Sequence, residues 1–447
     1  MAKSNEIDML HGPLLMKILI FSLPLAASSV LQQLFNSIDV AVVGRFASNQ
    51  ALAAVGSNAP VIGLMINLFL GVSMGANVII SNHIGQKDSQ RIRESVNTVG
   101  MVAIICGILL MGIGLLTAKP ILTLMGTPKD VLPLAVLYLR IFFIGIPFFL
   151  VFDFGSAILR SLGDTRRPLY ILVIAGIVNT ILNLVFVIYF HMSVAGVAIA
   201  TDIANAVSAV LIVWILTHEK EPYKLHIKSI GINRGELKRM LMIGIPAGIQ
   251  GMIFSFSNVL VQTAINTHGA DAIAGSAAAL NFEYYCYFVI SAFDGAAITF
   301  IGQNYGAGKK ERVKRIYWIC MALSVIGSGV LNWLFAWKSQ FFLGFFSQDR
   351  IVQEFGTIRM KTVLAWQFIA CSYEISASAL RGMGKSMTPT VLTIFGTCLL
   401  RICWVYAICP IWKSFDTIML VYPISWIATG IMVCTAFYVT ARKKLCC

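Results

Sequence analysis

The sequence LRSLG at residues 159–163, with Pro168 five residues after it, recurs as LRGMG at residues 380–384, followed by Pro389. The two copies lie 221 residues apart in a chain of 447 residues. Other residues correspond at nearly the same offset: Pro24 with Pro246, Asn36 with Asn258, Gly85 with Gly306, and Asp153 with Glu374. The chain therefore contains two related halves.

The composition is that of a membrane protein. Apolar residues make up 58% of the chain and charged residues 12%, which is about half the charged fraction of a soluble protein. The apolar stretches run to about 20 residues or more, the length of helix that crosses a hydrocarbon layer roughly 30 Å thick. Strands of a β-barrel are disfavoured, because they alternate and run only about 10 residues. We predict an all-α integral membrane protein with twelve spans, near 15–43, 52–80, 96–117, 134–159, 169–190, 194–216, 240–266, 272–302, 316–337, 357–380, 390–412 and 417–440.

Basic residues are concentrated on one side of these spans. The net charge is +14, and 24 of the 34 Lys and Arg residues fall at the two ends and in the loops on the same side as the N-terminus. Cytoplasmic loops carry such an excess, so the charge indicates topology rather than nucleic acid binding. It predicts a multi-pass protein of the plasma (bacterial inner) membrane with both termini cytoplasmic. The polar first twelve residues and the long apolar run after them do not fit a cleavable signal peptide.

The longest polar stretch, residues 217–239, separates six spans from six. An even number of spans per half gives both halves the same orientation, so they are expected to be parallel repeats related by a pseudo-twofold axis along the membrane normal. We predict an N-terminal lobe at 1–216, a cytoplasmic linker at 217–239 and a C-terminal lobe at 240–447. Two lobes of this kind are typical of transporters in which a central site is exposed to each side in turn.

The first span carries a polar stripe. Gln32, Asn36 and Asp39 are spaced i, i+4 and i+7 and therefore share one helical face. A charge at the bilayer centre costs roughly 2.5–3.5 kcal/mol on insertion scales, so such a stripe is expected to face a neighbouring helix or water rather than lipid.

Further polar residues lie at similar depth in the same half. Asn179 and Asn183 share a face of the fifth span, and Thr201 and Asp202 lie near the middle of the sixth. With Asp39 they offer carboxylate, amide and hydroxyl oxygens, the ligands that a small hard cation prefers. We predict a cation or proton site formed by these five residues. The alternative is ordinary hydrogen bonding between helices, worth about 0.6 kcal/mol per contact.

The second half lacks this cluster. The corresponding positions are Val261 for Asp39, Leu400 for Asn179 and Trp404 for Asn183. Arg401 stands at the same depth, where a cation would otherwise lie. Both halves share the requirements of the fold but not the oxygen ligands, which favours a functional role for the first-half cluster.

Other ionisable residues have two interpretations each. Asp153 and Glu374 precede Arg160 and Arg381 by seven residues, so each pair either lines a central cavity or forms an internal salt bridge. The eighth span carries aromatic residues and acids, which suit an organic cation or an interfacial aromatic belt. The substrate-cavity candidates are Gln32, Asn36, Asp153, Gln250, Asn258, Glu283, Tyr284, Asp294 and Glu374.

No motif for ATP or for catalysis is evident. The GAGKK sequence at 306–310 is not a phosphate-binding loop, because Gln303 stands where Gly is required and Lys310 where Ser or Thr is required. We therefore predict no enzymatic activity, no nucleotide and no organic cofactor, with an ion gradient as the energy source. The ten cysteines show no metal-binding spacing, and Cys446-Cys447 receives no role.

Together these residues resemble the multidrug and toxic compound extrusion (MATE) family over nearly the whole chain. The resemblance rests on FNSID at 35–39, VGR at 43–45, ALAAVG at 51–56, IGQ at 84–86, LRSLG at 159–163, IGQNYGAG at 301–308 and LRGMG at 380–384. It implies export of amphipathic, often cationic, compounds coupled to Na⁺ or H⁺. The cation site of that family uses an aspartate on the first span, two polar residues four apart on the fifth and a threonine on the sixth. The matching residues, Na⁺ ligands if sodium is the coupling ion, are Asp39, Asn179, Asn183 and Thr201.

Two positions depart from that pattern. Asn183 stands where some members have aspartate, which leaves one carboxylate fewer. The stretch Met252–Ser257 lacks the glutamate that some members use on the seventh span.

We therefore predict a secondary active antiporter, working as a monomer in the lipid bilayer, that exports a small organic substrate in exchange for Na⁺ or H⁺ by alternating access. The alternative is a flippase of lipid-linked glycans, from a related branch with a similar two-lobe fold. A membrane scaffold or receptor would show no ion-dependent flux, and a channel would not accumulate substrate against a gradient.

Overall fold

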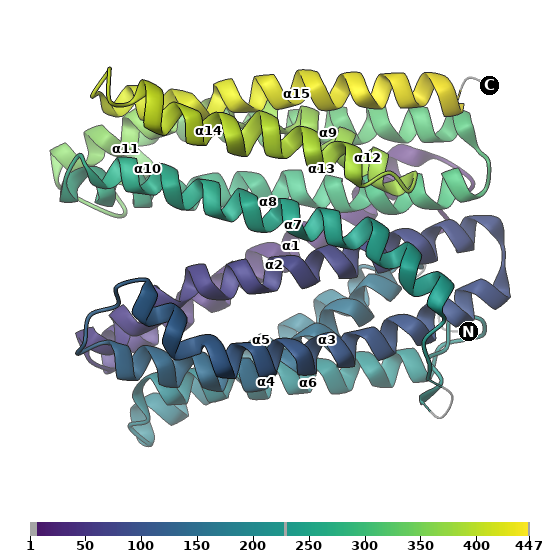
Figure 1. Cartoon of the computed structure of the whole chain (residues 1–447), viewed down its shortest axis with the longest axis horizontal. Helices are drawn as coiled ribbons and strands as arrows, with labels where there is room; N and C mark the ends of the chain where they lie inside the picture. The colour runs from purple at the N-terminus through teal and green to yellow at the C-terminus, as the bar shows by residue number, and fades with distance from the viewer. Residues whose placement is uncertain (1–6, 228–229, 446–447) are drawn as a thin grey trace. The chain divides into compact units, whose positions relative to one another are not determined.

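The computed structural model describes residues 7–227 and 230–445, and it is built of long helices (Figure 1). The predicted twelve spans are confirmed, since twelve helices within these ranges are long and apolar enough to cross a membrane. Cys446-Cys447 lies outside the described residues.

The first half contains α1 (Leu14–Phe46), α2 (Asn49–Gln86), α3 (Ser89–Leu124), α4 (Leu132–Ser161), α5 (Arg166–Leu184) with the π-helical turn η1 (Val185–Tyr189), and α6 (Ser193–Thr217). The second half contains α7 (Arg234–Asn266), α8 (Ala270–Gly306), α9 (Lys310–Trp337), α10 (Ser339–Leu343), α11 (Arg350–Thr362), η3 (Leu364–Ile369), α12 (Ala370–Gly382), α13 (Met387–Thr393), η4 (Ile394–Leu399), α14 (Leu400–Cys403), η5 (Trp404–Ile408) and α15 (Phe415–Leu445). The tenth and eleventh spans are thus interrupted by 3-10 and π-helical segments, which hydropathy did not predict.

The chain forms two compact units whose limits differ from the predicted lobes. The first unit is built around Ala27–Gly248, and the second combines Met9–Ala26 with the chain from Ile249 onward. Helices α1 and α7 therefore each belong to both units, and each divides close to an internal proline, Pro24 or Pro246. Proline removes a helical hydrogen bond and kinks the helix, so it permits the two parts of a helix to follow different neighbours.

Small residues hold the first part of α7 in the first unit. Gly71 and Gly75 of α2 face Gly244 and Gly248 of α7, and each pair has the GxxxG spacing. A Cβ atom added to Gly75 would lie 2.5 Å from the Met240 carbonyl oxygen, so the two backbones approach too closely for any larger residue. Without a hydrophobic drive between helices in lipid, close backbone contact of this kind supplies the packing energy.

A buried polar contact joins the same helices at their other end. The Glu236 carboxylate at the start of α7 is 4% exposed and lies 2.8 Å from Nε2 of His83, which ends α2. Ser95 of α3 donates to the same carboxylate oxygen at 3.2 Å. His83 is therefore a packing residue of the first unit, a role that its place near the end of a span did not indicate.

The predicted linker also belongs to the first unit. Arg167 of α5 bonds to Glu219, and Arg93 of α3 pairs with Glu221 at 3.1 Å. The described part of residues 217–239 therefore packs on the first six spans.

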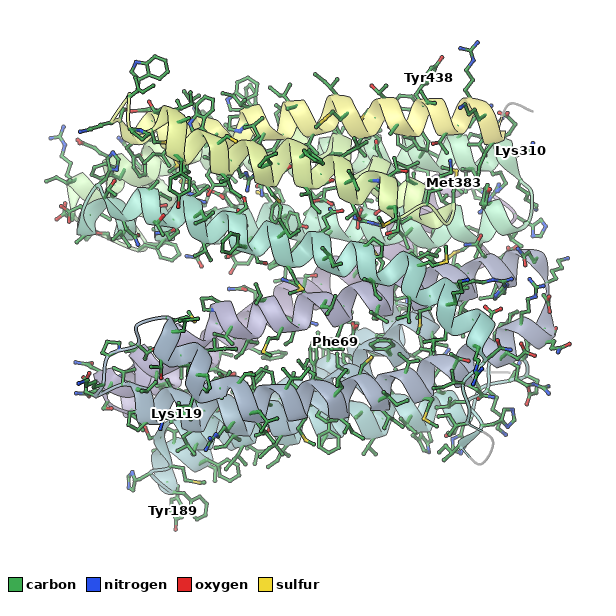
Figure 2. The ribbon with its side chains drawn as sticks, viewed as in Figure 1. Phe69, Lys119, Tyr189, Lys310, Met383 and Tyr438 are labelled. Atoms are coloured by element: carbon green, nitrogen blue, oxygen red, sulfur yellow. The ribbon has the colours of Figure 1, made fainter. Side chains whose placement is uncertain are left out.

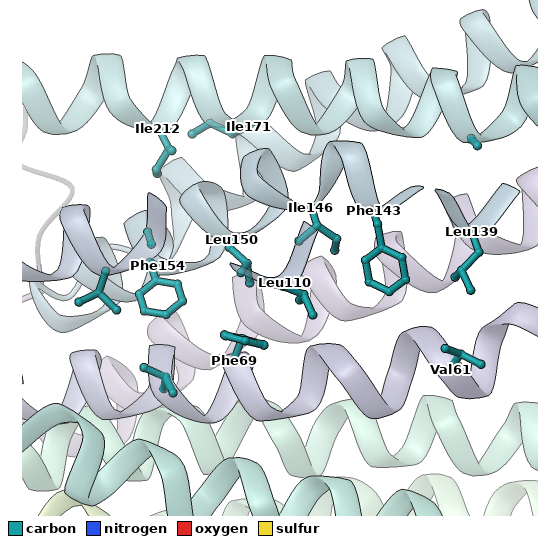
Figure 3. Packing of buried hydrophobic residues seen from close by; sticks show 14 of the residues in the cluster. Val61, Phe69, Leu110, Leu139, Phe143, Ile146, Leu150, Phe154, Ile171 and Ile212 are labelled. Carbon is teal, nitrogen blue, oxygen red and sulfur yellow. The ribbon is translucent and has the colours of Figure 1, made fainter. Parts of the chain in front are cut away.

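A large apolar cluster fills much of the interior of the first unit. Phe143, Leu150 and Phe154 lie on one face of α4 and meet Leu110 of α3 and Phe69 of α2 (Figure 3). The outer faces are apolar too, since Leu116, Trp337 and Tyr438 are all more than half exposed. Figure 2 shows Tyr438 pointing outward from α15. Exposed apolar surface of this extent is expected where lipid is the solvent.

Candidate functional site

Asp39 is the buried end of the polar stripe on α1. Its side chain is 8% exposed, whereas Gln32 and Asn36 are exposed. The structure therefore brings only Asp39 into the interior of the first unit, and a role for the other two as substrate contacts remains a prediction.

The side chains around Asp39 come from α5 and α6, as predicted. Asn183 donates through Nδ2 to Oδ1 of Asp39, and the Thr201 hydroxyl lies 3.5 Å from Oδ2. Asn179 connects the two, since its Nδ2 donates to Thr201 at 3.2 Å and its Oδ1 accepts from Asn183 at 3.2 Å. Because Asn179 and Asn183 are one helical turn apart, a single face of α5 supplies both amides.

The Thr201 hydroxyl has a single proton to donate. It lies 2.9 Å from the Val197 carbonyl and 3.5 Å from the Asp39 carboxylate, so the nearer carbonyl is the better acceptor. A lone pair of Thr201 then faces an anionic oxygen of Asp39. Two such oxygens repel each other until a cation or a proton lies between them.

An unused oxygen points to the same conclusion. Asn183 is fully buried, and its Oδ1 has no hydrogen-bond partner among the described residues. Rotation of the amide would turn this oxygen toward Asp39 and withdraw the N–H that now bonds to it. Hydrogen bonds join the side chains of this cluster to one another. The oxygens of Asp39, Thr201 and Asn183 are also of the kind that bind a small cation.

Asp39 has no basic partner among the described residues. The side chains that contact its carboxylate there are those of Asn183 and Thr201, both neutral. A carboxylate buried among neutral groups is costly unless an ion or a proton neutralises it. Three or more His, Cys, Asp or Glu residues do not gather at any metal site in the part of the chain described.

Asp202 makes no hydrogen bond to this cluster among the described residues, and its part in the cation site stays a prediction. A Cβ atom added to Gly145 of α4 would lie 1.9 Å from Asp202 Oδ1, so the carboxylate packs directly over that glycine. Consecutive helical residues differ by about 100° around the axis, and Thr201 and Asp202 therefore face different helices.

Sequence reasoning missed Tyr138 and Gly145 on α4. Tyr138 is 8% exposed and lies within electrostatic reach of both Asp39 and Asp202. Gly145 makes room for the Asp202 carboxylate. Tyr138 and Gly145 are seven residues apart and therefore share one helical face of α4, which was the available signal.

The second unit has no equivalent cluster. Val261, at the position of Asp39, is fully buried, and Arg401 is 1% exposed. Arg401 donates to Asn258 Oδ1 at 2.7 Å and to Ser425 Oγ at 3.2 Å. In the described part of the second unit, an arginine with neutral partners thus lies near the positions that correspond to the Asp39 cluster.

The two acids at the repeated LR motifs behave differently. Asp153 pairs with Arg160 at 3.5 Å, which is the salt-bridge alternative. Arg381 instead donates to Gln250 at 2.7 Å, and Glu374 lies within electrostatic reach of Asp294. The two copies of the LR motif therefore make different side-chain contacts.

Two other substrate-cavity candidates, Asp294 and Gln250, make their contacts within the second unit. Ser378 of α12 donates to Asp294, and the Gln250 side chain is 9% exposed. Neither is shown to line a cavity, and both stay predictions as substrate contacts.

Glu283 is buried and fully engaged. Both its oxygens accept from Arg359 of α11, at 2.6 and 2.9 Å, and Arg359 also donates to Ser276 at 2.6 Å. Its charge is therefore neutralised within the unit, which is a structural role rather than the predicted contact with an organic cation. The neighbouring Tyr284 is exposed, as either an interfacial residue or a substrate contact would be.

The fold and the buried polar site together define a two-unit membrane protein with an unpaired acid in one unit. A model of the MatE family matches residues 24–185 and again residues 246–407, so the chain belongs to the MatE family. This confirms the family that the sequence motifs indicated.

Similarity to individual proteins extends over most of the chain. It is 27% identical over 384 residues to "Probable multidrug resistance protein YoeA" of Bacillus subtilis (strain 168), covering 84% of this chain and 83% of that protein. It is 24% identical over 363 residues to "FAD transporter" of Shewanella oneidensis, covering 79% of each. A solved structure titled as an outward-facing multidrug resistance MATE family transporter has a TM-score of 0.90 at 19% identity, with 97% of each chain covered. At that identity the structural likeness establishes the fold.

Proposed function

We propose that this protein is a secondary active antiporter that exports amphipathic organic compounds in exchange for Na⁺ or H⁺, with Asp39 as the ion-coupling residue. The observation that carries the proposal is a buried carboxylate whose described partners, Asn183 and Thr201, are neutral. Relatives named as multidrug resistance proteins support export of organic compounds.

The charge of the cluster limits the ion. Asp39 is the one carboxylate that contacts Asn183 and Thr201 in the described chain, and Asn179 joins the cluster through these two residues. One negative charge is neutralised by one monovalent ion, so each transport cycle moves a single Na⁺ or H⁺ at this site. A divalent ion would leave a buried positive charge, which is costly.

Ion binding acts on α1 through the hydrogen bonds of Asp39. An ion replaces the Asn183 N–H at the carboxylate, and the contacts among α1, α5 and α6 change. Because Leu14–Ala26 of α1 belong to the second unit and its remainder to the first, a change at Asp39 is transmitted along a continuous helix. If this change weakens the substrate site, substrate weakens ion binding by the same factor.

The location follows from the charge distribution. A protein with 24 of its 34 basic residues on one side of the membrane is expected in the plasma (bacterial inner) membrane with both ends in the cytoplasm. A cysteine introduced near either end should then react with a membrane-impermeant maleimide only after the cells are opened.

The test is ion-driven flux in proteoliposomes. Efflux of rhodamine 123, a fluorescent organic cation, is measured with a Na⁺ gradient alone and with a pH gradient alone, which identifies the coupling ion. Asp39→Asn keeps the shape of the side chain but removes its charge, so gradient-driven efflux should fall at least 100-fold while the protein still elutes as a folded species. Asp416→Asn is the matched control, since Asp416 is an exposed acid at the start of α15. Normal efflux by Asp39→Asn, or equal loss in both variants, contradicts the proposal.

A further inference from the structure

Arg401 is a buried cation whose charge no described acid neutralises by direct contact. Its hydrogen-bond partners are the neutral side chains of Asn258 and Ser425. Its Nη2 atom is buried and has no hydrogen-bond partner among the described residues. An ionisable group held at this depth in a membrane protein requires a functional explanation, and a buried donor without a partner is one that a water, an ion or a ligand can satisfy.

The nearest described acid cannot serve as counter-ion. Glu283 lies within electrostatic reach of Arg401, but both of its oxygens already accept from Arg359. The two arginines lie near the same ring, Tyr422, with guanidinium carbons 4.6 Å from its centroid for Arg401 and 5.4 Å for Arg359. Arg359 is thus a neutralised structural residue, whereas Arg401 leaves a net positive charge.

The repeat provides an internal comparison. The residue 221 positions before Arg401 is Thr180, whose hydroxyl donates to its own helix at 2.9 Å. The fold therefore accommodates a small neutral residue at this position, and the arginine is not needed to build the helix.

The local backbone is also unusual. Arg401 lies in α14, a segment of four residues between the π-helical turns η4 and η5. π-Helical turns are rare and occur frequently at functional sites, because they leave backbone groups and side chains out of register with the surrounding helix.

We propose that Arg401 and Asn258 bind the anionic group of an amphipathic substrate, so that the second unit accepts compounds carrying a carboxylate, sulfonate or phosphate. Asn258 is half-buried, whereas Arg401 is buried; the Asn258 oxygen accepts from Arg401 and its NH₂ group is left as a donor. The N–H groups on Nη2 of Arg401 are the second set of donors for the anionic group. Phe254, whose ring centroid is 5.2 Å from the Arg401 guanidinium carbon, and Tyr422 supply apolar faces for the adjoining part of the substrate.

This inference rests on the proposed export function and adds the charge of the substrate to it. An acidic first-unit site and a basic second-unit site give the chain separate places for the coupling ion and for an anionic substrate. The relative named as an FAD transporter shows that a family member is described with an anionic substrate, and that description belongs to the relative alone.

The test compares two dyes that share a ring system and differ in charge. Binding of fluorescein, an anion, and rhodamine 123, a cation, is measured by fluorescence anisotropy with the full chain in nanodiscs. A hydrogen bond to a charged group contributes about 1.5–3 kcal/mol, or roughly 10- to 100-fold in affinity. Arg401→Gln should therefore weaken fluorescein binding at least tenfold and shift the preference toward rhodamine 123.

Two further variants complete the test. Arg350→Gln removes an exposed positive charge from the same half of the chain, with a side chain 91% exposed, and should leave both affinities unchanged. Arg401→Lys keeps the charge but loses the planar fork, so it should bind fluorescein with intermediate affinity even if the glutamine variant does not fold.

Three results overturn the proposal: no fluorescein binding by the unmodified chain, equal binding after either Arg401 substitution, or an equal effect of Arg350→Gln. Because the measurement is of binding, its failure is distinct from failure of ion-driven rhodamine efflux. Loss of the flux with retained Arg401-dependent binding refutes antiport and leaves the anion site standing.

Discussion

Replacement of Asn183 by aspartate should convert the cluster around Asp39 into a much stronger cation site. Asn183 now donates a hydrogen bond to Asp39, so Asn183→Asp would place a second carboxylate in contact with the first. Two unit charges about 4 Å apart interact by about 4 kcal/mol at an effective dielectric constant near 20. A bound cation relieves this repulsion, so the interaction energy appears as tighter ion binding.

If all of this interaction energy went into ion binding, Na⁺ affinity would rise by nearly three orders of magnitude, since about 1.4 kcal/mol changes an equilibrium constant tenfold. We expect Na⁺ affinity to rise by about 10- to 1000-fold, because water that enters the site will screen part of the repulsion. Efflux should slow, since the ion must also be released in every cycle. The assay is ²²Na⁺ binding to the purified chain at pH 8, where protons compete weakly.

The neighbouring amide provides the control. Asn179 bonds to Thr201 and to Asn183 rather than to Asp39. Asn179→Asp should therefore tighten Na⁺ binding less than Asn183→Asp does. If Asn183→Asp leaves Na⁺ affinity within threefold of the unmodified chain, or if both aspartates act equally, the assignment of Asn183 as the direct neighbour of the ion is refuted.

Three other substitutions separate coupling from folding. Thr201→Val removes the hydroxyl oxygen that faces Asp39 and should weaken ion binding by about 0.5–1.5 kcal/mol in the same assay; unchanged affinity would remove Thr201 from the ligand set. Glu283→Gln leaves Arg359 without its counter-charge and should destabilise the chain by about 3–5 kcal/mol, seen as a lower melting temperature in detergent; an unchanged melting temperature would contradict the structural role of the pair. Gly75→Leu should destabilise the contact of α2 with α7 by about 1–3 kcal/mol or more, whereas Gly63→Leu, on the same helix with open space around it, should not; equal melting temperatures would refute the role of close backbone packing.

Hydropathy and repetition were sufficient to predict the twelve helices, because a chain in lipid must satisfy its backbone hydrogen bonds within each span. The spacing of Asn179 and Asn183 likewise predicted a shared face, since helical geometry fixes which residues are neighbours along one helix. Asp39 could be proposed as the coupling residue from the rarity of an acid in such a span and from the absence of a counterpart in the second half.

Contacts between helices could not be predicted in this way. The repeat suggested equivalent roles for Asp153 and Glu374. Asp153 pairs with Arg160, whereas Glu374 is within electrostatic reach of both Asp294 and Arg381, and Arg381 donates its hydrogen bond to Gln250. Asp202 was expected in the cation cluster, but the direction of its side chain depends on which helix packs against each face of α6.

The sequence by itself determined the class of protein, the repeat and the position of the acid, because these follow from the cost of placing polar groups in lipid and from the period of the α-helix. The tertiary structure alone decided that α1 and α7 are divided between the two units, that Asn183 turns an N–H rather than an oxygen toward Asp39, and that Arg401 lacks a counter-ion. These features arise from close packing between segments far apart in the chain, and helical period carries no information about such packing.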